Sequence, residues 1–89
     1  MTWKIEFSIR ATQDLDKLDP QHARRINQFL FERLMRLDNP RSVGEALHGS
    51  QLGEYWKYRV GDYRLISKIE DNRLLILVLR IGHRREIYR

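Results

Sequence analysis

Three β-strand patterns follow one another in the last third of the chain, and this feature constrains the fold most. Residues 55–60 (YWKYRV) and 63–69 (YRLISKI) alternate large apolar with polar side chains, which is typical of strands with one buried face. Only Gly61-Asp62 separates them, and this predicts a two-residue β-hairpin loop. Residues 74–79 (LLILVL) are continuously apolar, as expected of a central strand that is covered on both faces.

The first half of the chain predicts one strand and two helices. Residues 3–7 (WKIEF) alternate apolar with charged side chains, which indicates a half-buried strand. Ser8 is a candidate N-cap for a short helix over 8–18. Asp19-Pro20 predicts the start of a second helix, and Asp38-Asn39-Pro40 predicts its end.

The order of these elements predicts an α+β fold with a single domain over residues 1–89. Two N-terminal helices are expected to pack on one face of a small, mostly antiparallel, four-stranded sheet. Residues 40–53 (PRSVGEALHGSQLG) are rich in glycine and predict a loop.

Phe31 and Met35 lie off the apolar stripe of the second helix. They either pack beneath residues 41–53 or form a docking patch for a partner protein.

The positive charge of the chain is concentrated near its end. Residues 1–54 hold eight Lys/Arg and eight Asp/Glu, whereas residues 55–89 hold nine and four, so the net charge of +5 belongs to the second segment. Such one-sided charge favours a polyanionic partner, although a basic, soluble surface is the simpler interpretation. The chain has no cysteine, and no apolar run approaches the roughly 20 residues of a membrane span. We therefore expect a cytoplasmic protein with no membrane association and no cofactor.

Strand alternation divides the hairpin into two faces. The core face is predicted to hold Trp56, Tyr58, Val60, Tyr63, Leu65 and Ile69. The other face is predicted to hold Tyr55, Lys57, Arg59, Arg64 and Lys68. A two-residue loop places Arg59 opposite Arg64, and like charges directly across a sheet are destabilising. A bound anion would compensate, and guanidinium groups suit phosphate oxygens; alternatively, the two side chains splay into water, or a bulge changes the pairing.

The chemistry that these residues favour is cleavage of RNA by its own 2′-hydroxyl. The histidines His22, His48 and His83 lack metal-ligand spacing, and no phosphate-binding GxxxxGK loop is present. Arg and Lys can stabilise the charge of a pentavalent phosphorane, and Lys, Tyr or His can move protons. The segment IGHRREIYR (81–89) supplies further candidates, namely His83, Arg84, Arg85, Tyr88 and Arg89.

Three segments together resemble the RelE/ParE superfamily of type II toxins, in particular its RelE/StbE branch. They are SIRATQDLDKL (8–18), YWKYRVGDYR (55–64) and IGHRREIYR (81–89). The resemblance implies a RelE-like, microbial-ribonuclease-like fold over the whole chain. It also implies a metal-independent mRNA interferase that cuts A-site mRNA on the ribosome and leaves a cyclic phosphate. Such a toxin is neutralised by a cognate, RelB-like antitoxin that wraps around it.

The resemblance also implies roles for individual residues. Lys57 and Arg59 match two basic strand residues of the family, Arg64 and Arg84 match its phosphate-binding arginines, and Tyr88 matches its C-terminal tyrosine. These five are the predicted catalytic residues. The predicted RNA-binding residues are Tyr55, Lys68, His83, Arg85 and Arg89. Two other functions stay open: a ParE-like inhibitor of DNA gyrase, and a non-catalytic module that binds RNA or an antitoxin.

Overall fold

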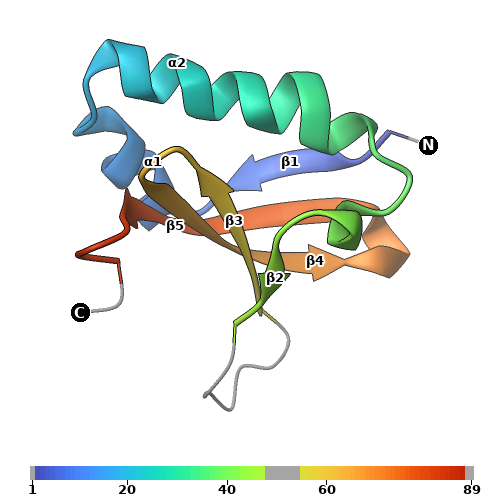
Figure 1. Cartoon of the computed structure of the whole chain (residues 1–89). Helices are drawn as coiled ribbons and strands as arrows, with labels where there is room; N and C mark the ends of the chain where they lie inside the picture. Colours follow the sequence, from blue (N-terminus) through green and yellow to red (C-terminus); the bar gives the residue numbers. More distant parts are fainter. Residues whose placement is uncertain (1, 48–54, 88–89) are drawn as a thin grey trace.

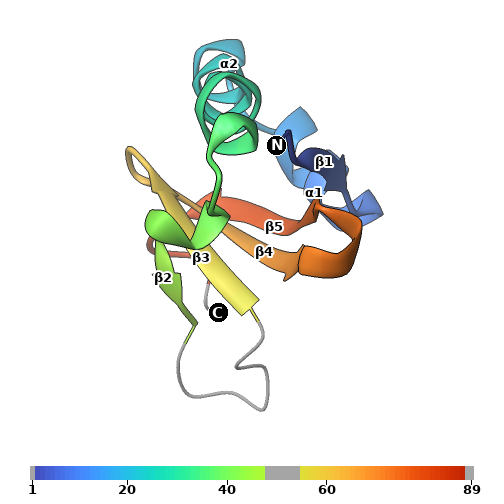
Figure 2. The ribbon, with the colours of Figure 1, turned by 90° about the vertical axis from the view of Figure 1, so that its right-hand side faces the viewer.

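The computed structural model describes residues 2–47 and 55–87, and it has two helices on one side of a five-stranded mixed sheet (Figure 1). The sheet order is β1-β5-β4-β3-β2, in which β1 runs parallel to β5 and every other pair is antiparallel. Figure 2 shows α2 above the sheet, with α1 beside β1 and β5. The elements are β1 (Lys4–Phe7), α1 (Ile9–Asp16), α2 (Pro20–Gln28), β2 (Glu45–Ala46), β3 (Tyr55–Val60), β4 (Tyr63–Glu70) and β5 (Leu75–His83).

The α+β architecture was predicted, but the prediction of four strands was wrong. The additional strand, β2, lies within the predicted loop 40–53 and pairs with β3 through Glu45 opposite Lys57 and Ala46 opposite Trp56. Gly44 precedes it with φ +79°, and a Cβ atom at this position would lie 2.5 Å from the carbonyl oxygen of Lys57. Only glycine fits so close to β3, and a two-residue strand is too short to show any alternation.

The last strand is longer than its apolar run. β5 extends to His83, four residues beyond the predicted end at 79, and a bulge between Ile66 and Ser67 of β4 and their partners interrupts its pairing. Arg80 and Gly82 break the apolar pattern without breaking the strand. The extension carries β5 alongside the hairpin end of β4, so that Gly82 lies opposite Arg64.

The first helix is capped as predicted. The Ser8 hydroxyl oxygen accepts a hydrogen bond from the Ala11 N–H (3.0 Å), and the Ser8 hydroxyl donates to the Leu79 carbonyl (2.8 Å). The Asp14 carboxylate of α1 accepts from the Ile81 N–H (2.9 Å) and pairs with Arg80 (3.0 Å). Because β1 ends at Phe7, opposite Val78, α1 covers the edge of β5 from there onwards.

The second helix continues beyond α2 as a π-turn, η1 (Phe29–Arg33), and a 3₁₀ turn, η2 (Leu34–Arg36). Its apolar stripe packs on the sheet, where Ile26, Leu30 and Leu34 are fully buried. Phe31 is 38% exposed, and its ring centroid lies 6.2 Å from that of Phe7 in β1. It therefore packs against β1. Residues 48–53 of the predicted loop lie outside the described residues, and the role of Phe31 as a docking patch stays a prediction.

The predicted core face of the hairpin is confirmed. Tyr58, Val60, Leu65 and Ile69 are buried beneath the helices, and Trp56 and Tyr63 pack half-buried against them. Two short 3₁₀ turns, η3 (Pro40–Ser42) and η4 (Asp71–Arg73), complete the described fold. No helix in the described part of the chain is long and apolar enough to cross a membrane.

Candidate functional site

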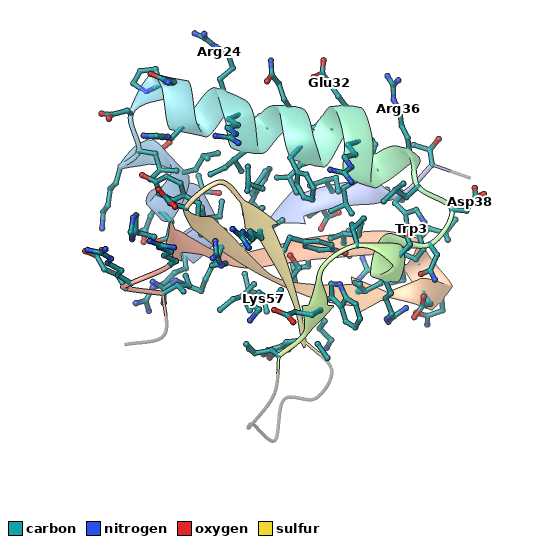
Figure 3. The ribbon with its side chains drawn as sticks, in the orientation of Figure 1. Trp3, Arg24, Glu32, Arg36, Asp38 and Lys57 are labelled. Atoms are coloured by element: carbon teal, nitrogen blue, oxygen red, sulfur yellow. The ribbon has the colours of Figure 1, made fainter. Side chains whose placement is uncertain are left out.

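The hairpin presents its cations on the face of the sheet that the helices leave uncovered. The pairing of β3 with β4 runs without a bulge from Tyr55 opposite Lys68 to Val60 opposite Tyr63, and it places Arg59 opposite Arg64 as predicted. Lys57 precedes Arg59 by two residues and shares its face. Figure 3 shows Lys57 on the side of the sheet away from α2.

Lys57, Arg59 and Arg64 line one shallow depression together with Gly44 and Glu45. The Arg59 side chain is exposed, and no hydrogen bond or ion pair joins it to another described residue. Two guanidinium groups across one pair of strands repel each other, and an anion between them would remove that repulsion. The depression therefore has the charge and the donors to bind a phosphate group.

Glu45 is a member of this site that the sequence did not indicate. Its Oε1 atom lies 3.0 Å from Nζ of Lys57, in an ion pair whose side chains are 64% and 24% exposed respectively. An exposed pair of this kind contributes only about 0–1 kcal/mol. A phosphate group can therefore compete with Glu45 for Lys57. The pairing depends on β2, which was not predicted, so spacing alone could not have found Glu45.

The hairpin turn brings Arg64 and Arg84 to the same end of the sheet. Arg64 Nη1 donates to the carbonyl oxygens of Gly61 (3.2 Å) and Tyr63 (3.1 Å). The Arg84 N–H donates to the Asp62 carbonyl (2.8 Å), and Arg84 Nε lies 3.9 Å from Asp62 Oδ1. Gly61 adopts φ +60°, which is the left-handed conformation that such a loop requires. The turn thus anchors both arginines that the resemblance identifies as phosphate ligands.

His83 lies on the other face from Arg64. It is opposite Tyr63, and the two rings meet edge-on with centroids 5.8 Å apart. The Tyr63 ring also packs against the His22 ring of α2, with the two ring centroids 5.0 Å apart. His83 Nδ1 accepts from the Arg85 N–H (3.2 Å). His83 thus belongs to an aromatic cluster beneath the turn, apart from the depression.

The remaining predicted site residues lie further from the turn or outside the described residues. Tyr55 and Lys68 face each other at the opposite end of the hairpin, about 14 Å from Arg59 at the rise of an extended strand. They can contact only flanking parts of an extended ligand. Arg85 is exposed in the turn after β5. Tyr88 and Arg89 lie outside the residues that the structure describes.

Tyr58 lies between the two basic residues of β3 but takes no part in their face. Its hydroxyl is buried and donates to the Pro40 carbonyl (2.7 Å), and burial raises its pKa well above the usual value. It therefore stays protonated at neutral pH and serves the core. Within residues 2–47 and 55–87, no three His, Asp or Glu side chains gather as a metal site would require.

Similarity to known proteins extends over nearly the whole chain. The profile of a family described as ParE toxin of type II toxin-antitoxin system, parDE, matches residues 5–88. Toxin RelG of Mycobacterium tuberculosis (strain ATCC 25618 / H37Rv) is 35% identical over 89 residues, which cover 100% of this chain and 99% of that protein.

Solved structures show the same similarity. A chain in the toxin–antitoxin complex RelBE2 from Mycobacterium tuberculosis matches with a TM-score of 0.84 and 31% identity, over 97% of this chain and 95% of that chain. A mutant of E. coli RelE in the free state matches with a TM-score of 0.77 and 19% identity, over 99% of this chain and 90% of that chain. The second likeness concerns the fold alone.

Proposed function

This chain belongs to the RelE/ParE family of type II toxins, and from that premise we propose that it is an endoribonuclease that cuts mRNA in the ribosomal A site. The observation that carries the proposal is the depression on the open face of the sheet. Arg59 lies directly across from Arg64, and Lys57 lines the same depression. Folding alone disfavours this pairing of cations, whereas binding of a phosphodiester favours it.

The reaction requires no metal in this scheme. The 2′-oxygen of one nucleotide attacks the adjacent phosphorus while the bond from phosphorus to the 5′-oxygen breaks. The products are a cyclic phosphate and a 5′-hydroxyl. One proton leaves the 2′-hydroxyl and another reaches the 5′-oxygen, and Lys57 and Tyr88 are the candidates for these transfers. Arg59, Arg64 and Arg84 stabilise the additional negative charge of the phosphorane.

Glu45 adds a condition to this mechanism. Lys57 pairs with the Glu45 carboxylate at 3.0 Å, so the ion pair has to open before the ammonium group contacts a phosphate oxygen. A bound ribosomal substrate supplies the competing negative charge.

The proposed protein partner is a cognate, RelB-like antitoxin. Relatives of known structure include the RelBE2 complex and an archaeal RelE–RelB complex from Pyrococcus horikoshii OT3. Phe31, together with Ala23 and Asn27, lines a shallow groove on α2 that suits an apolar segment of such a partner. Phe31→Ser should weaken antitoxin binding at least tenfold, measured by titration calorimetry. Unchanged affinity would remove this groove from the interface.

Inhibition of DNA gyrase is the second candidate function. The description of the matching family names a ParE toxin, whereas the similar curated proteins carry the names RelG and RelE. A gyrase inhibitor would act through protein contacts and would have no need of opposed arginines. A non-catalytic module that binds RNA or antitoxin would retain the basic face without cleaving.

Mapping of mRNA 5′ ends after brief induction separates these functions. The ribonuclease predicts new 5′ ends in phase with codons for the wild-type chain, and their loss in Arg64→Ala. Arg36→Ala is the matched control, because Arg36 lies in η2 and projects away from the sheet (Figure 3). DNA damage without new 5′ ends would favour gyrase. Antitoxin binding with neither effect would favour the non-catalytic module.

A further inference from the structure

A second concave surface lies between α2 and the neighbouring edge of β3. It is lined by Arg25 and Gln28 of α2, Phe29, Glu32 and Arg33 of η1, and Arg59, Val60 and Gly61 of the hairpin. Arg59 also lines the depression that holds Lys57 and Arg64. The two hollows therefore meet at Arg59, and we call the second one the arginine groove.

Helical spacing aligns the cations of this groove. Arg25, Phe29 and Arg33 follow one another at intervals of four residues, so they form one row along the helix over about 12 Å. The Arg33 guanidinium carbon lies 5.9 Å from the centroid of the Phe29 ring. Arg25 ends against the hairpin turn, where a Cβ atom on Gly61 would lie 3.1 Å from its Nη1.

The arginine groove has more positive charges than negative charges among its lining residues. Arg25, Arg33 and Arg59 form no ion pair with any described residue, and Glu32 is the one carboxylate among the lining residues. Other arginines of the fold do have carboxylate partners, as Arg41 has with Asp71. Three guanidinium groups around one hollow suit a ligand with several negative charges.

We propose that the arginine groove binds the phosphodiester backbone of RNA beside the scissile phosphate. This inference rests on the proposed function and extends its site around the edge of β3. Regularly spaced single charges match a row of guanidinium groups. An acidic protein segment is less suited, because its charges have no fixed spacing. The backbone belongs either to the mRNA that flanks the cut or to ribosomal RNA.

The test compares two double substitutions on one helix. Arg25→Ala with Arg33→Ala empties the groove, whereas Arg24→Ala with Arg36→Ala removes the same charge from the face that points away from the sheet (Figure 3). Binding of the full chain is measured against salt concentration with two probes. One is a short, single-stranded 2′-O-methyl oligonucleotide that cannot be cut, and the other is ribosomes without mRNA.

The groove variant should lower the slope of log affinity against log salt by about 1.4 with the oligonucleotide, since each lost phosphate contact on a single strand contributes about 0.7. The control should keep the wild-type slope, and the charge-retaining pair Arg25→Lys with Arg33→Lys should restore it. A loss with the oligonucleotide assigns the groove to mRNA, and a loss with ribosomes alone assigns it to ribosomal RNA.

Three results would overturn the proposal. The first is a salt slope of the groove variant that equals the wild-type slope with both probes. The second is an equal fall of the slope in the control pair. The third is a groove variant that weakens antitoxin binding and leaves RNA binding unchanged. Failure of the proposed function has a different signature. Induction would then produce no codon-phased 5′ ends, while the groove variant would still lower the salt slope of RNA binding.

Discussion

The two faces of the sheet are made by alternate residues of the same strands, yet their chemistry is opposite. Beneath the helices, Tyr58 and Leu65 are fully buried, and the Tyr58 hydroxyl donates to a backbone carbonyl. On the open face, their neighbours Arg59 and Arg64 oppose each other as like charges. Folding explains why Tyr58 and Leu65 are buried, whereas it disfavours the opposed pair of Arg59 and Arg64. Residues that folding does not favour are therefore the better guide to binding in this molecule.

Leu65→Ala should have the largest effect, and the effect should fall on stability. The side chain is 0% exposed, so its truncation leaves a cavity and should lower the free energy of unfolding by about 2–5 kcal/mol. Urea denaturation of the purified chain measures it. A loss below about 1 kcal/mol would mean that the core rearranges around this strand and that the contrast between the faces is weaker than the burial indicates.

Arg64→Ala, one residue away, should act on activity alone. Removal of one group that stabilises the transition state costs about 10²–10³ in rate, measured by cleavage of mRNA on purified ribosomes. The free energy of unfolding should change by no more than about 0.5 kcal/mol, because two lost hydrogen bonds are offset by relief of repulsion from Arg59. An inactive variant that was also strongly destabilised would place Arg64 among the structural residues.

Tyr58→Phe should lower the free energy of unfolding by about 1–2 kcal/mol at neutral pH, since the Pro40 carbonyl loses its donor. Burial raises the pKa of Tyr58 in the folded chain. Its contribution is therefore complete below the unfolded value, about 10, and is lost as the pH rises through the folded value. As the pH rises above about 10, the free energy of unfolding should fall more steeply for the wild type than for the variant, as measured by urea denaturation at each pH. Tyr55→Phe, on the open face, is the control and should change stability by less than about 0.5 kcal/mol.

Local patterns predicted the parts of the fold that depend on local chemistry. The Ser8 cap, the Gly61-Asp62 turn and the opposition of Arg59 and Arg64 follow from residue type and spacing, and the structure confirms them. The strand β2 and its Glu45–Lys57 pair could not be predicted, because two residues are too few to show any alternation.

The placement of the C-terminal candidates depends on tertiary contacts in the same way. Arg84 is anchored by the Asp62 carbonyl, and His83 packs on Tyr63 because β5 extends beyond its apolar run. Neither contact has a signal in the sequence. The catalytic roles of Lys57, Arg59, Arg64 and Arg84 stay predictions, and Tyr88 lies outside the described residues.

Glu45→Gln should produce the smallest effect, but it should test the contrast between the two faces of the sheet most sharply. The substitution keeps the size of the side chain and removes its charge from the depression, so the Glu45 side chain no longer competes as a carboxylate for the Lys57 ammonium. At about 4 Å in water one such charge contributes about 1 kcal/mol, so affinity for an uncleavable 2′-O-methyl oligonucleotide should rise about fivefold. Stability should hardly change, because the pair is exposed.

Glu6→Gln is the matched control, because Glu6 lies in β1 at the opposite edge of the same sheet. An equal gain in both variants would mean that RNA responds only to the total charge of the chain. A gain confined to Glu45→Gln would show that the open face binds phosphate at Lys57 in particular, and that Glu45 restrains this binding until a substrate displaces it.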